Sequence, residues 1–105
     1  MWEPYKKGFK SYLQLEKSLS DNSVEAYMRD IEKLTQYIQQ SGNLKTPTDI
    51  KLKDLQDFMK WIGEFGMSAK SQARIISGIK SFYKYCLIEQ ISKNDPTTLL
   101  EAPKL

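Results

Sequence analysis

Apolar side chains recur every three or four positions over most of this chain, and no stretch alternates convincingly with a period of two. The clearest case lies at residues 20–40, where the apolar positions share one side of a helical projection. These positions are Val24, Tyr27, Met28, Ile31, Leu34 and Ile38. Residues 4–19, 52–64 and 68–87 show the same spacing. The pattern therefore predicts four amphipathic helices.

Cap and turn residues separate these helical segments. Ser20 and Ser68 each precede a segment, and a serine hydroxyl accepts hydrogen bonds from the free amides of a first turn. Gly42 suits the left-handed conformation that ends many helices. Four helices joined by short or moderate connections indicate an all-α protein, folded as a compact four-helix bundle.

A fifth, shorter helix is expected near the end of the chain. The pair Asp95-Pro96 is typical of a cap followed by the first residue of a helix. We therefore expect a short closing helix over residues 96–100, with Leu99 and Leu100 folded back on the core.

Composition narrows the functional classes. The chain has 105 residues, enough for one domain whose core forms without metal or disulfides, and its net charge is +3. It has no histidine and one cysteine, Cys86, on an apolar helix side, so the usual metal sites and histidine triads are excluded. No Gly-rich phosphate loop, signal peptide or membrane-spanning run is present. We expect a cytoplasmic protein without a cofactor, an active site or a membrane partner.

The segment at residues 68–87 has an unusual polar side. No Asp or Glu occurs between Glu64 and Glu89, so cations, hydroxyls and Gly78 are expected to face outward without carboxylates. Such a face suits a polyanion, and a glycine there would let a phosphate backbone approach closely. The alternative is an ordinary solvated helix that happens to be basic.

Two motifs and the C-terminal segment resemble a known family. Residues 19–31, with the sequence LSDNSVEAYMRDI, resemble the opening helices of Xer-type tyrosine recombinases. Residues 66–83, GMSAKSQARIISGIKSFY, resemble the last long helix of the same domain. Residues 94–96 and 102–105 resemble its exit into the catalytic domain. The motifs occur in the family's order over nearly the whole chain.

The resemblance implies that residues 1–105 form an N-terminal core-binding domain with a SAM-like fold. In this family the domain and a separate catalytic domain clamp double-stranded DNA at the recombination site, and the second and fourth helices approach the major groove. The catalytic residues belong to the other domain, which is expected to lie outside this chain. The expected partners are duplex DNA and, in the full-length parent, other recombinase subunits, forming a tetramer on DNA.

The expected DNA contacts combine cations, which neutralise phosphates, with hydroxyls, which donate to phosphate oxygens. Lys70 or Arg74 is the best candidate for reading guanine. For Asn22 and Ser23 the alternative role is helix capping, and for the serines of the fourth helix it is a solvated hydroxyl. The expected site comprises Lys70, Ser71, Arg74, Ser77, Lys80, Ser81 and Lys84 in the fourth helix and Asn22 and Ser23 in the second.

Two other functions fit the same pattern. A helical protein-interaction module would bring the basic face against an acidic protein. A helix-turn-helix regulator would use the tight break at residues 66–68 to join a supporting helix to a recognition helix, and it would bind palindromic DNA as a dimer.

Overall fold

Four α-helices carry the fold, and they lie close to where the sequence predicts them. The computed structural model describes residues 2–42 and 45–101, and it contains no strand in these ranges. Its elements are α1 (Glu3–Leu15), α2 (Asp21–Ser41), the short 3-10 helix η1 (Pro47–Asp49), α3 (Leu52–Glu64) and α4 (Ala69–Ile88). The all-α, four-helix prediction is confirmed, whereas the motif at residues 102–105 lies outside the described residues.

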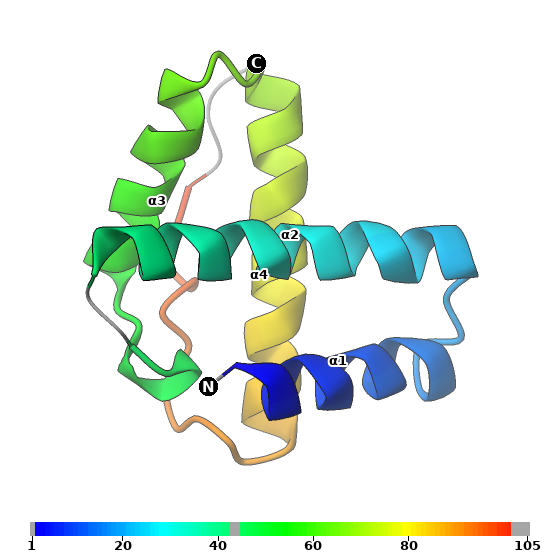
Figure 1. Cartoon of the computed structure of the whole chain (residues 1–105). Helices are drawn as coiled ribbons and strands as arrows, with labels where there is room; N and C mark the ends of the chain where they lie inside the picture. The colour runs from blue at the N-terminus through cyan, green and yellow to red at the C-terminus, as the bar shows by residue number, and fades with distance from the viewer. Residues whose placement is uncertain (1, 43–44, 102–105) are drawn as a thin grey trace.

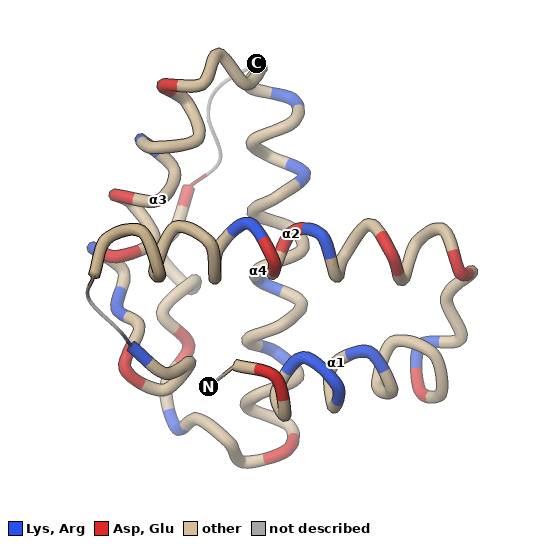
Figure 2. The backbone as a smooth tube through the Cα atoms, viewed as in Figure 1, with Lys and Arg blue, Asp and Glu red and all other residues tan. Residues whose placement is uncertain are grey.

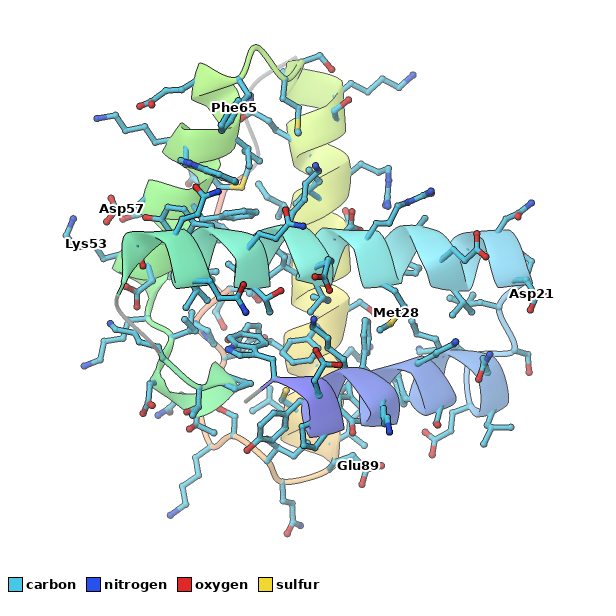
Figure 3. The ribbon with its side chains drawn as sticks, in the orientation of Figure 1. Asp21, Met28, Lys53, Asp57, Phe65 and Glu89 are labelled. Carbon is cyan, nitrogen blue, oxygen red and sulfur yellow. The ribbon has the colours of Figure 1, made fainter. Side chains whose placement is uncertain are left out.

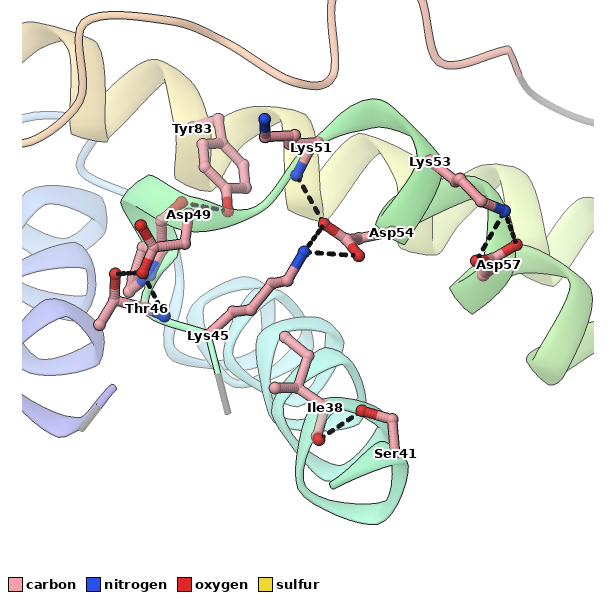
Figure 4. Close-up of polar contacts among 11 residues, drawn as sticks. Ile38, Ser41, Lys45, Thr46, Asp49, Lys51, Lys53, Asp54, Asp57 and Tyr83 are labelled. Carbon is pink, nitrogen blue, oxygen red and sulfur yellow. Dashed lines mark hydrogen bonds and ion pairs between the residues drawn. The ribbon is translucent and has the colours of Figure 1, made fainter. Parts of the chain in front are cut away.

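The predicted caps are present. The hydroxyl of Ser20 accepts from the backbone N–H of Ser23 at 3.3 Å, and Ser68 caps α4 in the same way. Gly42 ends α2 with a φ of 72°. α3 starts after Lys51, which has no capping oxygen, and the carboxylate of Asp54 compensates by accepting from the Lys51 N–H at 2.9 Å (Figure 4).

The first helix ends earlier than predicted. α1 stops at Leu15, not near residue 19, because Ser18 adopts a left-handed backbone conformation with a φ of 50°. The chain then turns, and the N–H of Leu19 donates to the carbonyl of Leu13 at 3.1 Å. As a result Leu15, which was expected on the apolar edge, is 79% exposed.

The predicted closing helix does not form, because residues 96–99 make turns. Asp95 does act as a cap, but its carboxylate accepts from both the N–H and the hydroxyl of Thr97. Such local side-chain bonds offer the backbone an alternative to a helix. Leu100 is buried as expected, whereas Leu99 is 73% exposed.

Figure 1 shows how the helices are arranged. α1 and α2 run antiparallel, α2 crosses α4 near its middle, and α3 lies beside the N-terminal half of α4. The core between them is rich in aromatic rings, and Phe82 of α4 stacks on Trp2 and meets Phe9 edge-on. None of the helices in the described part is long and apolar enough to cross a bilayer.

Polar contacts fix the helices and the loop after α2. Lys6 of α1 reaches Glu32 of α2 at 2.6 Å. Burial opposes the charge on Lys6, but hydrogen bonds to carboxylates outweigh this and raise its pKa. The buried hydroxyl of Tyr83 in α4 donates to the carbonyl of Pro47 at 2.9 Å and so holds η1 in place (Figure 4).

Candidate nucleic-acid interface

All the charged side chains that α4 itself places on its outward face are positive. Lys70, Arg74, Lys80 and Lys84 are exposed along the helix, and α4 contains no acidic residue. Figure 2 shows this as a succession of blue segments on α4, whereas α2 alternates blue and red. The charge asymmetry expected from the sequence is therefore present on the element itself.

A hollow of about 340 Å³ lies where the C-terminal half of α4 meets α2 and the end of α1. Three lysines and two serines surround it, and no carboxylate is among its lining residues. Its remaining walls are aliphatic and aromatic. The lining residues are Leu13, Lys17, Leu19, Tyr27, Ser77, Lys80, Ser81 and Lys84. A concave surface lined by one sign of charge concentrates the electrostatic potential, and this one attracts anions.

The fold adds two residues to this hollow that were not among the predicted contacts. Lys17 follows the end of α1, and its ammonium lies 5.9 Å from the centre of the Tyr12 ring. Tyr27 of α2 was expected only as a core residue, but it is half-buried and lines the hollow. The signal that would have revealed Lys17 is its place beside the break at Ser18, where the chain turns from α1 into α2.

Arg74 has a partner that the sequence did not indicate. Its Nη2 donates to the two carboxylate oxygens of Asp30 at 2.9 and 3.1 Å and to the carbonyl of Ala26 at 3.1 Å. The guanidinium also lies 5.9 Å from the centre of the Tyr27 ring. The expectation of an outer face without carboxylates is therefore wrong at Arg74, because α2 supplies one from 44 positions away in the sequence.

The two members of this ion pair differ greatly in exposure. The side chain of Asp30 is 5% exposed and that of Arg74 is 48% exposed. Burial disfavours the carboxylate and raises the pKa of Asp30 to about 6, although the charge and hydrogen bonds of Arg74 act in the opposite direction. The positive charges of Arg29 and Lys33 also oppose the rise.

Gly78 is buried at the crossing of α2 and α4, and it does not face outward as expected. A Cβ atom there would overlap the carboxylate of Asp30 and would lie 2.8 Å from its Cγ and 2.9 Å from its Cβ. The glycine therefore makes room for Asp30 between the helices, and the expected close approach to a DNA backbone is ruled out.

Apart from Arg74, which is paired with Asp30, the predicted contacts fall into two groups in the structure. Ser77, Lys80, Ser81 and Lys84 meet at the hollow. The hydroxyl of Ser77 also donates to the carbonyl of Ala73 at 3.2 Å, within its own helix.

The second group lies away from the hollow. Lys70 and Ser71 occupy the first turn of α4, and the N–H of Ser71 donates to the Ser68 cap. Asn22 and Ser23 belong to the first turn of α2, beside the residue labelled Asp21 in Figure 3. Ser23 takes part in capping, the alternative role that the sequence left open. DNA contacts by all of these residues stay predictions.

Neither a metal site nor a reactive thiol is found among the described residues. In the described part of the chain no cluster of potential ligands could hold a metal ion. Cys86 is buried, and burial raises the pKa of its thiol to about 12, which keeps it in the unreactive protonated form.

Comparison with known proteins gives a consistent result. The family profile described as the phage integrase N-terminal SAM-like domain matches residues 7–90, which include both sequence motifs. Tyrosine recombinase XerD of Staphylococcus epidermidis is 36% identical over 94 residues, which are 90% of this chain and 32% of that protein. XerD of Staphylococcus haemolyticus is 40% identical over 96 residues, covering 89% of this chain and 31% of the relative. No solved structure matches significantly. The chain thus spans about a third of the length of the relatives it matches.

Proposed function

We propose a DNA-binding function for this chain, which belongs to the phage integrase N-terminal SAM-like domain family. It is the part of a tyrosine recombinase that binds double-stranded DNA through α4. The observation that carries the proposal is the hollow beside α4, where Lys17, Lys80 and Lys84 converge without a carboxylate.

The chemistry of the hollow suits a sugar-phosphate backbone. Ammonium groups neutralise phosphates and release condensed counterions, which favours binding at low salt. The hydroxyls of Ser77 and Ser81 supply further donors to phosphate oxygens, and the apolar wall accepts the sugar. Lys70 lies on the same side of α4 as Ser77 and nearer to the start of the helix. The bound duplex would therefore lie along the helix.

In this proposal residues 1–105 supply one half of a clamp and contribute no catalytic residue. The reacting groups would belong to a separate catalytic domain of the parent recombinase, and the parent would act with other recombinase subunits, as a tetramer on DNA. Half of a clamp binds weakly, so we expect nonspecific dissociation constants of about 1 μM or weaker for this domain alone.

Charge reversal at the hollow tests the proposal. The variant Lys80→Glu with Lys84→Glu should lose duplex binding in fluorescence anisotropy at low salt, while its circular dichroism spectrum stays helical. The matched control, Lys60→Glu with Lys93→Glu, makes the same charge change at exposed positions that do not line the hollow. It should keep most of the affinity.

Salt dependence gives a second measure. Each lost phosphate contact should reduce the slope of log K against log salt by about 0.9, so two lost lysine contacts should reduce it by about 1.8. Equal losses in the hollow variant and the control would contradict the site. Binding to an acidic peptide but not to DNA would favour the protein-interaction alternative.

A further inference from the structure

The ion pair between Arg74 and Asp30 links two helices and also leaves donors of the guanidinium at the surface. Only one nitrogen of the guanidinium, Nη2, makes the contacts to Asp30 and Ala26. A guanidinium carries five N–H donors, and three of them belong to Nε and Nη1. With the side chain 48% exposed, the held guanidinium therefore presents further donors at the surface of α4.

The arginine also lies beside the hollow. It is one helical turn before Ser77 on α4 and stands over the ring of Tyr27, and both of these residues line the hollow. Two helices fix its direction, since Ala26 and Asp30 anchor it to α2 while its backbone belongs to α4. An arginine held in this way loses little freedom when it binds a phosphate.

Asp30 has the opposite effect on charge. While its carboxylate is ionised, the pair as a whole is neutral, and a phosphate near Arg74 is repelled by the buried negative charge of Asp30 as well as attracted by the guanidinium. When the carboxyl is protonated, the full charge of Arg74 acts on the phosphate. The groups that act on this carboxyl are Arg74 from α4 and Arg29 and Lys33 from α2 itself.

We propose that Asp30 is a positioning residue for DNA binding, which aims Arg74 across the helix crossing and sets the strength of its phosphate contact through its own protonation. The inference rests on the proposed function, because it names a control of the same DNA-binding face. The space left by Gly78 gives the carboxyl its buried position. Its pKa, raised to about 6 by burial, places the titration within an accessible pH range.

Binding and protonation are then linked in both directions. A bound phosphate favours the protonated carboxyl, and the protonated carboxyl favours a bound phosphate. Two charges several ångströms apart at a protein surface support a change of about threefold to tenfold in affinity at low salt. The same linkage shifts the titration midpoint of Asp30 upward by about 0.5 to 1 unit in the complex. The chain has no histidine to obscure this titration.

The first experiment compares pH profiles of duplex affinity. Wild-type protein should bind about threefold to tenfold more tightly near pH 5.5 than near pH 8, and Asp30→Asn should bind at both with the tighter affinity. The matched control is Asp57→Asn, which removes a carboxylate paired with Lys53 on α3, and it should keep the wild-type pH profile. If Asp30→Asn keeps the pH dependence of the wild type, the inference is overturned. A merely structural role for Asp30 would not predict that the variant loses this pH dependence.

The second experiment needs no variant and stands even if Asp30→Asn fails to fold. The carboxyl carbon resonance of Asp30 is followed by NMR against pH, for the free protein and for its complex with a short duplex. An upward shift of the midpoint in the complex supports the inference, and an equal or lower midpoint refutes it. Binding that is real but independent of pH removes only this inference, whereas folded protein that binds no duplex at any pH removes the proposed function as well.

Discussion

The substitution Gly78→Ala, at the crossing of α2 and α4, should destabilise the protein. On an exposed helix this change would add about 1 kcal/mol of stability, because alanine has the higher helix propensity. Here the new methyl group would overlap the carboxylate of Asp30 and lie 2.8 and 2.9 Å from its Cγ and Cβ. Unstrained carbon contacts are about 3.5 to 4.0 Å, so the side chain cannot simply swing its tip away.

The magnitude follows from the two ways in which the overlap can be relieved. If the helices move apart, the cost is that of overpacking a core, about 1 to 3 kcal/mol. If Asp30 leaves its place, the contact with Arg74 is lost, and because the Arg74 side chain is 48% exposed this costs about 1 to 3 kcal/mol, less than for a fully buried pair. The protein takes the cheaper of these routes, so after the propensity gain of about 1 kcal/mol is subtracted we expect a net loss of up to about 2 kcal/mol in the free energy of unfolding.

Urea denaturation followed by circular dichroism measures this loss. The matched control is Gly63→Ala in α3, where the added Cβ would lie 3.5 Å from Nε2 of Gln72, an ordinary contact. That variant should be as stable as the wild type or up to about 1 kcal/mol more stable. Combining Gly78→Ala with Asp30→Ala should remove most of the added cost, since the two positions are coupled. A Gly78→Ala protein about 1 kcal/mol more stable than the wild type, with the full propensity gain of an unobstructed helix position, would refute the reasoning.

Two further predictions concern buried ionisable groups. Tyr83→Phe leaves the Pro47 carbonyl without its donor and should cost about 1 to 2 kcal/mol in urea denaturation, whereas the half-buried Tyr5→Phe should cost less than about 0.5 kcal/mol. Because the pKa of Asp30 rises on folding from 3.8 to about 6, the folded state binds more protons there, and this group lowers stability as pH rises through that range. Relative to wild type, Asp30→Asn should therefore gain about 1 kcal/mol in unfolding free energy between pH 5 and pH 8, and a constant difference would contradict the raised pKa.

The helices could be predicted from the sequence because apolar spacing and capping residues act between positions close together in the chain. Apolar spacing set the number of helices, and α3 occupies the predicted residues 52–64. The caps at Ser20 and Ser68 were recognisable because a capping hydroxyl acts within three residues. The errors came from local details that periodicity does not encode, namely the left-handed backbone at Ser18 and the turn held by Asp95.

The site was only partly predictable, because its geometry depends on tertiary contacts. Reading α4 alone brought together Ser77, Lys80, Ser81 and Lys84, since they share one side of the helix. It could not show that the turn after α1 brings Lys17 to the same hollow. The role of Gly78 was also hidden, because the atom that needs its space belongs to α2.

The net charge at the outward face of α4 therefore depends on how the helices pack. It cannot be obtained by counting the cations of α4 alone. The ionised carboxylate of Asp30 offsets the positive charge of Arg74, whereas Lys17 adds a positive charge from outside the helix. Fields are screened over about 8 Å at physiological salt, so a phosphate responds mainly to charges in its immediate surroundings. At neutral pH the strongest attraction for a phosphate thus shifts from the start of α4 to the hollow, where three lysines have no carboxylate among the lining residues. In the proposed complex, a duplex bound at the hollow would have Arg74 at its margin, where protonation of Asp30 would change the strength of the phosphate contact.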